Sequence, residues 1–556
     1  MSLQEEVNKR RTFAIISHPD AGKTTLTEKL LLYGGAIHLA GSVKARKTSK
    51  HAVSDWMEIE KQRGISVTSS VLQFDYEGHR INILDTPGHQ DFSEDTYRTL
   101  MAADSAVMLI DVAKGVEAQT KKLFKVCRER GIPIFTFVNK IDHFGRNPFD
   151  IMDEIETVLG IRAYPMNWPL GVNGSYEGIY DRTASSIELF EKDTNHGQRK
   201  LASTKGSADD PAFKELLSDE VHQSLIDDIE LLDAAGDAFD MEKVKNGTLT
   251  PMFFGSAMTN FGVKPFLEKF LELAPKPQPR KTKEGSVDPM SEQFTSFIFK
   301  IQANMNPQHH DRIVFMRICS GKFEKGMTVT HRQSGKQVRL MQPQQFLATE
   351  RTLVEDAWPG DIIGVFDSSS LGVGDTLYSG KTLVTFADFP TFPAELFARI
   401  RAKDSMKRKQ FLKGMTQLAQ EGAVQIYENP GSMESYIVGA VGQLQFEVLE
   451  YRLLHEYGVT LEMNRLPYSV AKWIYSQDRD YRDLKNIDSA MIVKDHKQRI
   501  VLLITNEWQA DWIIERNPDF LFCSTPDELP LDSTEYEKAP LSEISERGAF
   551  LGGLTF

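Results

Sequence analysis

Residues 13–25 read Phe13-Ala14-Ile15-Ile16-Ser17-His18-Pro19-Asp20-Ala21-Gly22-Lys23-Thr24-Thr25, and this stretch decides the fold. The first four residues predict a buried strand, and Leu26, Leu30 and Leu31 have the spacing of a helix. The loop between them matches G-x-x-x-x-G-K-[ST], except that Ser17 replaces the first Gly. Such a loop binds phosphate groups through backbone N–H groups and a helix N-terminus, so residues 17–25 are predicted phosphate-binding residues.

A second motif supports this interpretation, because an isolated G-K-T triplet arises easily by chance. Residues 81–84 predict an apolar strand that ends in Asp85-Thr86-Pro87-Gly88-His89. Asp85 and the Thr24 hydroxyl are predicted to bind Mg²⁺, and Gly88 is predicted to contact the terminal phosphate through its N–H. His89 is predicted to orient the attacking water, as a Gln does in small GTPases, so His89 and Lys23 are the predicted catalytic residues. Alone, Asp-x-x-Gly would be an ordinary turn.

A third strand-and-loop motif predicts which nucleotide base is bound. Residues 132–138 are apolar and lead into Asn139-Lys140-Ile141-Asp142. Guanine presents two donors, N1–H and an exocyclic amine, to one carboxylate such as Asp142, whereas adenine presents an acceptor there. A site built on such a hydrogen bond rejects the wrong partner by about 10⁴-fold. GTP is therefore the expected substrate, with Asn139 toward the base edge and the Lys140 stem along the ring.

A weaker fourth signal is the strand 253–255, which ends in Ser256 and Ala257. These two residues are predicted to offer backbone N–H groups to the base oxygen. All four motifs occur in order at the ends of apolar strands, which is where open α/β sheets bind ligands.

The segment Asp55 to Val67, which contains Arg63-Gly64-Ile65-Ser66, resembles the first switch of translational GTPases, with Ser66 in place of Thr. This resemblance implies that Ser66 binds Mg²⁺, that His89 positions water, and that Pro19 and Ile65 form an apolar gate around His89. It further implies slow hydrolysis until a ribosome, whose large-subunit RNA docks near the nucleotide, completes the site.

The remaining chain predicts further domains, since 556 residues exceed the roughly 100–200 of one domain. We expect an α/β P-loop GTPase domain over 1–280 with an insertion around 150–250. A proline-rich linker at 275–279 separates it from a small β-barrel over 290–385. An α+β domain over 390–556 has the split βαβ, ferredoxin-like order, with strands at 396–402, 424–427, 434–441 and 459–463 and helices at 405–421 and 443–457. Two more strands, at 468–475 and 500–505, and a helix at 508–516 are expected after these. In the first of these helices, Leu412, Met415 and Ala419 are the expected core stripe.

This three-part plan, together with Phe323-Glu324-Lys325-Gly326-Met327 and residues 438–446, resembles the bacterial peptide-chain release factor 3 family over nearly the whole chain. The resemblance implies a ribosome-dependent GTPase that promotes dissociation and recycling of peptide-releasing factors at termination. The alternatives are another translational GTPase, similar to elongation factor G, or a metabolic GTPase subunit. A nucleotide-binding scaffold without catalysis is a third.

Composition limits the other partners. The net charge of −13 argues against a general nucleic-acid binder, so any RNA contact must use local basic patches at 44–50, 280–283 and 399–413, which could equally be solvated faces. Three distant cysteines predict neither a disulfide framework nor a metal site. With 41% hydrophobic residues but no long apolar run, the expectation is a folded, cytoplasmic monomer without membrane contact.

Overall fold

The computed structural model describes residues 2–36, 69–171, 176–190, 200–303, 312–347, 350–367, 371–387, 389–390, 392–429, 436–495 and 498–529. The chain divides into two compact units, Met1–Lys300 with Ile313–Ala387, and Ile301–Arg312 with Asp388–Phe556. Among the described residues, none of the helices has the length and apolar content needed to span a lipid bilayer.

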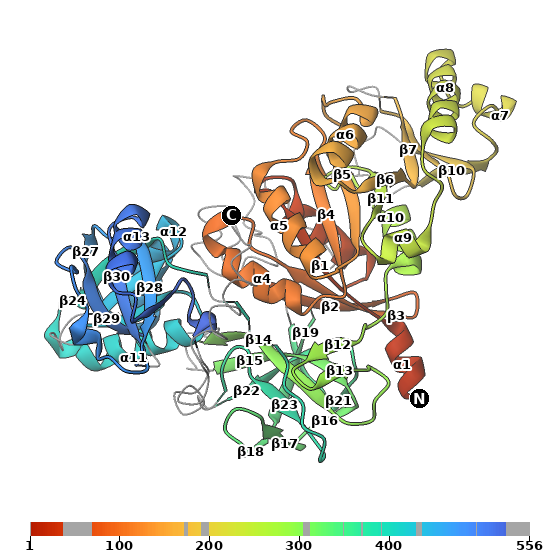
Figure 1. The fold of residues 1–556 in the computed structure, drawn as a ribbon. Helices are drawn as coiled ribbons and strands as arrows, with labels where there is room; N and C mark the ends of the chain where they lie inside the picture. The colour runs from red at the N-terminus through yellow and green to blue at the C-terminus, as the bar shows by residue number, and fades with distance from the viewer. Residues whose placement is uncertain are drawn as a thin grey trace. The chain divides into compact units, whose positions relative to one another are not determined.

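A seven-stranded sheet forms the centre of the first unit (Figure 1). Its strand order is β2-β3-β1-β4-β5-β11-β6. Strand β1 pairs in parallel with β3 and β4, β4 with β5, and β5 with β11, whereas β2 is antiparallel to β3. The strands are β1 (Arg10–Ser17), β2 (Ser70–Tyr76), β3 (His79–Asp85), β4 (Ser105–Asp111), β5 (Ile134–Asn139), β6 (Arg162–Pro165) and β11 (Leu249–Phe254). Strand β11 also pairs in parallel with β6, so six neighbouring strands are parallel and their carboxyl ends share one edge.

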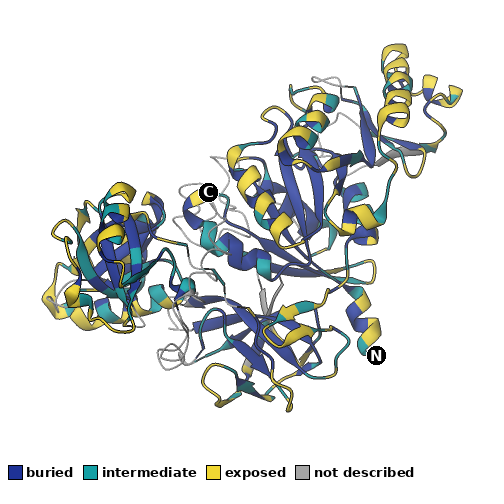
Figure 2. Cartoon of the chain, viewed as in Figure 1, coloured by how far each residue is buried: buried dark blue, intermediate teal, exposed yellow. Residues whose placement is uncertain are grey.

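Helices flank this sheet. Phe13 and Ile15 of β1 share a buried cluster with Leu26 of α2 and Phe270 of α10, and α5 packs against β1 and β4. In Figure 2 the strands are dark blue and the outer helix surfaces are yellow. The helices are α1 (Leu3–Lys9), α2 (Lys23–Tyr33), α4 (Ser93–Met101), α5 (Ala118–Glu129), α6 (Pro148–Glu154) and α10 (Val263–Leu273), with a 3₁₀ turn η1 (Gln90–Phe92) and a π-helical turn η2 (Ile155–Leu159).

A second sheet lies within the residues predicted as an insertion. Its order is β10-β9-β8-β7, and its neighbouring strands are antiparallel. The buried Trp168 of β7 donates its indole N–H to Asp228 of α8 at 2.9 Å, which attaches the helix to the sheet. The elements are β7 (Asn167–Leu170), β8 (Gly178–Asp181), β9 (Ser186–Phe190), β10 (Lys200–Lys205), α7 (Pro211–Lys214), α8 (Asp219–Ala235) and α9 (Met241–Lys245).

The remainder of the first unit is all-β. An eight-stranded sheet has the order β18-β17-β23-β14-β15-β22-β19-β20, beside the pairs β16-β21 and β12-β13. Gly321 and Gly326 adopt φ of 68° and 78°, which L side chains rarely reach. The strands are β12 (Arg280–Thr282), β13 (Gly285–Val287), β14 (Thr295–Ala303), β15 (Arg312–Ser320), β16 (Phe323–Glu324), β17 (Thr328–His331), β18 (Gln337–Arg339), β19 (Met341–Leu347), β20 (Glu350–Leu353), β21 (Asp356–Ala357), β22 (Ile362–Phe366) and β23 (Thr376–Tyr378).

Buried charges join this all-β part to the α/β part. Asp104, fully buried before β4, accepts from Arg317 of β15 at 2.5 Å and from Arg280 at 3.0 Å. Arg10 of β1 donates to Asp361 at 2.8 Å. Arg280 belongs to a predicted basic patch, yet it also donates to two carbonyl groups at the end of α4, so it is an internal contact rather than an outward charge.

The second unit contains an eight-stranded sheet of order β27-β24-β26-β25-β29-β30-β28-β31. Its first half has the split βαβ order predicted from the sequence, whereas β29 and β31 were not predicted. The elements are β24 (Leu396–Ala402), η3 (Ser405–Lys407), α11 (Arg408–Gln420), β25 (Gln425–Glu428), β26 (Tyr436–Ala440), α12 (Gln443–Tyr457), β27 (Leu461–Leu466), β28 (Val470–Tyr475), η4 (Tyr481–Asp483), β29 (Met491–Asp495), β30 (Ile500–Ile504), α13 (Glu507–Arg516), β31 (Leu521–Cys523) and η5 (Pro526–Glu528).

The predicted core stripe of α11 is wrong in part. Met415 is buried, but Leu412 and Ala419 are only half-buried. The buried face is instead formed by Phe411, Gly414, Met415 and Leu418. It turns toward α12, since a Cβ at Gly414 would lie 2.5 Å from Leu453.

The division into domains at 1–280, 290–385 and 390–556 stays a prediction. The two compact units do not test it, because the first unit contains both the α/β part and the all-β part.

Candidate functional site

The predicted motifs meet at the carboxyl edge of the seven-stranded sheet. Ile15 of β1 lies opposite Asp85 of β3, and Asp111 of β4 lies opposite Asn139 of β5. Strand β11, whose Phe254 lies opposite Val138, leads into Ser256 and Ala257. The parallel register therefore brings four segments that are distant in sequence to one edge.

The phosphate loop turns into α2 at Gly22. This residue has φ of 99°, and a Cβ there would lie 2.3 Å from the Asn139 amide nitrogen. A side chain is therefore excluded by both conformation and space. Helix α2 begins at Lys23, so its unpaired N–H groups and positive dipole end lie at the loop. Ser17, in place of the first Gly, is buried at the end of β1.

Lys23 and Asp85 form a buried ion pair at the centre of the site. The Lys23 ammonium donates to the Asp85 carboxylate at 2.5 Å, and both residues are less than a tenth exposed. The turn after Asp85 is held to β1, because the Thr86 hydroxyl donates to the Ile15 carbonyl at 2.7 Å. A buried charge is costly unless it is paired, so the pair fixes the distance between the two motifs.

Gly88 and His89 complete the second motif. A Cβ at Gly88 would lie 3.6 Å from the Pro19 Cα, which places this turn directly beside the phosphate loop. The His89 Nδ1 accepts from the Asp91 N–H at 3.3 Å, and the Asp91 carboxylate lies 3.2 Å from the same nitrogen. Asp91 thus orients the imidazole.

Asn139 and Lys140 link the base-binding motif to the phosphate loop. The buried Asn139 side chain donates to the Ala21 carbonyl and accepts from the Ala257 N–H, both at 2.8 Å. Lys140, at φ of 68°, donates to the Asp20 carbonyl at 2.6 Å and to Asp111 at 2.7 Å. The predicted contact of Asn139 with the base edge stays a prediction, since its amide joins two loops here.

Asp142 carries the most informative unpaired atom of the site. Its buried Oδ1 has no hydrogen-bond partner among the described residues, and its Oδ2 lies 3.7 Å from the His143 imidazole. A buried carboxylate oxygen needs a donor, which the guanine edge would supply. Burial first, and then the nearby Asp142 charge, raise the pKa of Tyr176 well above its ordinary value.

The other predicted residues divide into two groups. His18, Pro19, Asp20, Thr24 and Thr25 lie in the phosphate loop and the first turn of α2, and His18 donates its N–H to the Thr120 hydroxyl at 3.2 Å. Ser66, Ile65 and the basic residues 44–50 lie outside the described residues.

Comparison of the sequence with known families covers most of the chain. Residues 8–276 match the elongation factor Tu GTP binding domain, 293–380 match elongation factor G domain 2, and 386–514 match the class II release factor RF3 C-terminal domain. Peptide chain release factor 3 of Symbiobacterium thermophilum is 57% identical over 94% of this chain and 99% of its own length. The Enterococcus faecalis protein of that name is 54% identical over 93% of this chain and 98% of its own length. The chain belongs to the peptide chain release factor 3 family.

Members of this family are translational GTPases, and the chain accordingly binds guanine nucleotides and hydrolyses GTP. The predicted order of P-loop GTPase domain, barrel and α+β domain is confirmed. A crystal structure of a Thermus thermophilus protein, 23% identical, superposes with a TM-score of 0.66 over 85% of this chain and 71% of that chain, which shows a shared fold.

Sequence reasoning missed several residues that support the site. Asp111, which holds Lys140, ends an apolar strand just as Asp85 does, so the same rule could have found it. Asp91, Thr120 and Tyr176 carry no comparable signal, because their partners are set by tertiary packing.

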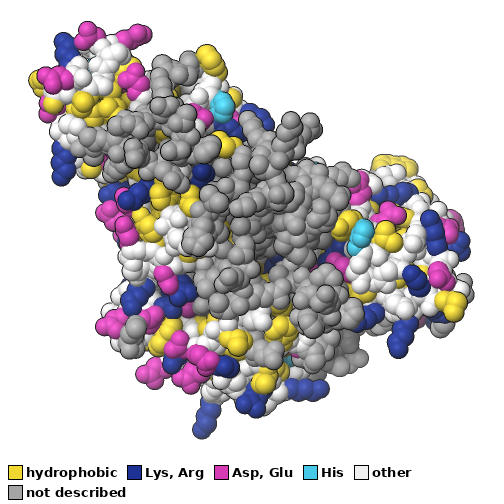
Figure 3. Space-filling model, turned by 180° about the vertical axis from the view of Figure 1, so that it is seen from behind, with side chains coloured by type: hydrophobic (Ala, Val, Ile, Leu, Met, Phe, Trp, Pro, Cys, Tyr) yellow, Lys and Arg dark blue, Asp and Glu magenta, His cyan; other side chains and the backbone are white. Residues whose placement is uncertain are grey.

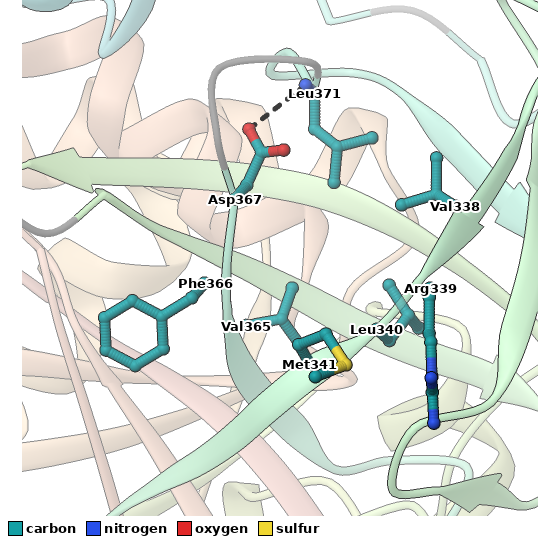
Figure 4. A pocket seen from close by; sticks show the side chains of 8 residues that line it. All are labelled: Val338, Arg339, Leu340, Met341, Val365, Phe366, Asp367 and Leu371. Carbon is teal, nitrogen blue, oxygen red and sulfur yellow. Dashed lines mark hydrogen bonds between the residues drawn. The ribbon is translucent and has the colours of Figure 1, made fainter.

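A pocket of about 420 Å³ lies in the all-β part, and none of its lining residues is a predicted site residue. Figure 4 shows the Leu371 N–H bonded to Asp367 at 3.2 Å beside it. Its lining is Val338, Arg339, Leu340, Met341, Val365, Phe366, Asp367 and Leu371.

The charged side chains of the described residues are mixed in sign on the face that Figure 3 shows, where Lys and Arg are interspersed with Asp and Glu. In the 399–413 patch, Arg401 pairs with Glu462 and Lys407 donates to the Gly458 carbonyl, while Arg399 and Lys413 are exposed. An RNA contact of this patch stays a prediction.

Proposed function

We propose that this chain is a ribosome-dependent GTPase that promotes the dissociation and recycling of peptide-releasing factors at translation termination. One observation carries the proposal: residues 386–514 match the class II release factor RF3 C-terminal domain in a chain that also contains the GTPase site. Its partners are then the ribosome, near the GTPase-activating region, and the releasing factors. The protein acts as a cytoplasmic monomer.

Guanine recognition is assigned to Asp142. Its unpaired Oδ1 and its Oδ2 accept from N1–H and the exocyclic amine of guanine, which supports GTP over ATP. Lys140, held by Asp111, lines the ring. The N–H groups of Ser256 and Ala257, which were predicted to contact the base oxygen, donate instead to the Phe261 carbonyl and to the Asn139 side chain. Asn139 keeps the Ala257 segment and the phosphate loop at a fixed distance.

The phosphates are assigned to residues 17–25. Lys23 contacts the outer oxygens, and the N–H groups at the start of α2 bind the inner ones. A magnesium triphosphate would bring an anion to Lys23 and a cation to Asp85, so exchanging their 2.5 Å ion pair for the substrate leaves neither charge unpaired. The oxygen donors Thr24, Asp85 and Ser66 suit Mg²⁺, which neutralises charge on the phosphates during transfer.

Hydrolysis is assigned to His89. Its imidazole, oriented by the Asp91 N–H, positions the attacking water, while Gly88 contacts the terminal phosphate. Loss of that phosphate removes the Gly88 contact and releases the switch. Ribosome binding completes the arrangement, which couples GTP turnover to ejection of the releasing factor.

The test compares wild type with His89→Ala in GTP hydrolysis with and without terminated ribosomes, and in turnover of a releasing factor. We expect His89→Ala to keep GTP binding and to lose stimulated hydrolysis by about 100-fold or more. His455→Ala, an exposed histidine on α12, is the matched control. Unchanged stimulated turnover in His89→Ala would refute the role of His89.

A metabolic GTPase subunit would ignore ribosomes, so a wild-type chain without ribosomal stimulation refutes the proposed function itself. An elongation factor G-like activity would show stimulation without faster turnover of the releasing factor.

A further inference from the structure

Asn167, the first residue of β7, extends the pairing between β6 and β11 with its side chain. The backbone pairing ends where the Met166 N–H donates to the Met252 carbonyl at 2.8 Å. Further along β11, the Asn167 amide donates to the Phe254 carbonyl at 3.1 Å and accepts from the Phe254 N–H at 2.7 Å. Asn167 is 4% exposed and Phe254 is fully buried, so water cannot replace these two bonds. The insertion therefore holds the end of β11 through one amide group.

The insertion contacts the turn after β11 at both of its ends. At the start of the turn, the Trp168 ring centre lies 5.4 Å from that of Phe254. At its end, the Tyr176 ring centre lies 5.3 Å from that of Phe261. The Phe261 carbonyl accepts from the Ser256 N–H at 2.9 Å, which closes the turn. Aromatic residues of the insertion thus pack against both ends of this turn.

The same turn supports the phosphate loop. Its Ala257 N–H donates to the Asn139 side chain, which in turn donates to the Ala21 carbonyl, both at 2.8 Å. Phe254 precedes Ala257 by three residues, which span at most about 10 Å even when extended. A Cβ at Gly255 would lie 2.6 Å from a backbone oxygen across the turn, so the turn is too closely packed to absorb a shift of Phe254. The position of Phe254 is therefore passed on to Ala257.

We propose that Asn167 is a positioning residue for guanine-nucleotide binding, which holds Phe254 so that Ala257 and the phosphate loop stay bonded to Asn139. The insertion thereby slows the release of bound GDP. The inference rests on the proposed function, because it takes the nucleotide to lie on the phosphate loop and Asp142 as assigned there. A purely structural role for Asn167 predicts a different result, namely a less stable insertion with an unchanged rate of GDP dissociation.

The test measures the dissociation of fluorescent GDP from the purified full chain by stopped flow, with an excess of unlabelled GDP and without ribosomes, together with thermal unfolding. In Asn167→Ala we expect the dissociation rate to rise about tenfold, because both backbone groups of Phe254 lose their partner and such losses fall mainly on the off-rate. In a chain that already carries Asn139→Ala, the same substitution should change the rate less than about threefold, since the contact through which Asn167 acts is then absent.

Two further variants keep the result decisive. Arg182→Met is the matched control, because it removes bonds to the Pro165 carbonyl at 3.0 Å and to Asp233 at 2.6 Å that stabilise the insertion without involving Phe254. It should lower the unfolding temperature and leave the GDP dissociation rate within twofold of wild type. Asn167→Asp has the shape of asparagine, so it tests the bonds without leaving a cavity even if Asn167→Ala does not fold. When ionised it cannot donate to the Phe254 carbonyl, so its rate should exceed that of wild type about threefold near neutral pH and approach that of wild type near about pH 5, where protonation restores the donor.

Three results would overturn the proposal. They are GDP dissociation within twofold of wild type in both Asn167 variants, an equal acceleration in Arg182→Met, and additive effects of Asn167→Ala and Asn139→Ala. A wild-type chain that binds GDP but ignores ribosomes would instead overturn the proposed function, and would leave these rates, measured without ribosomes, unchanged.

Discussion

Replacing Asn139 with Ala should weaken GDP binding strongly. The Asn139 amide joins the Ala21 carbonyl and the Ala257 N–H at 2.8 Å each, and all three residues are at most 2% exposed. The substitution removes both bonds where water has poor access. The phosphate loop and the Ala257 segment then lose their common support.

The loss of binding free energy can be worked out from the two groups that lose their hydrogen-bond partner, the Ala21 carbonyl and the Ala257 N–H. A buried polar group without a partner costs about 1–3 kcal/mol, and the carbonyl is cheaper than the N–H, so the total is about 2–4 kcal/mol. If nucleotide binding must restore both loops, this free energy is lost from binding. It corresponds to a decrease in GDP affinity of roughly 30- to 1,000-fold.

Isothermal calorimetry with GDP, together with thermal unfolding, measures the effect. Asn82→Ala is the matched control, because Asn82 is equally buried but its amide donates to Thr12 and to the Gly360 carbonyl. It should lower the unfolding temperature without changing GDP affinity. A GDP affinity in Asn139→Ala within twofold of wild type would contradict the support role derived from these bonds.

Three further perturbations have definite expected outcomes. Asp142→Ala should sharply weaken GDP binding, and equal affinity by calorimetry would refute the assignment of guanine recognition. Arg317→Met leaves the buried Asp104 with one partner fewer and should lower the free energy of unfolding by about 3 kcal/mol, measured by denaturant titration of the first unit; an unchanged midpoint would contradict it. Burial works to raise the pKa of Asp495, but Arg499 and the Trp473 indole N–H at 3.0 Å outweigh it and lower that pKa. The stabilisation is therefore complete above the unfolded pKa of about 3.9 and is lost as pH falls through the lower folded pKa, so Asp495→Asn should flatten the acid unfolding curve below about pH 4.

Local sequence was sufficient for the elements that carry the nucleotide motifs. Strand β1 and helix α2 appear at the predicted residues, because an apolar run and helical leucine spacing are local signals. The first helix and strands of the second unit were predicted for the same reason, and α12 spans the predicted 443–457. Strands β29 and β31 were missed, since β31 has only three residues and β29 alternates weakly.

The sequence by itself determined which functional groups lie at the ends of the strands. The phosphate loop, Asp85, His89 and Asp142 can each be recognised from a few neighbouring residues. Only the tertiary structure decided how these groups are held. Asn139 meets Ala21 across 118 residues, Asp104 meets Arg317 across 213, and Asn167 meets Phe254 across 87. No local periodicity encodes such pairs, because their partners are selected by the register of the sheet and by the packing of one part of the chain on another.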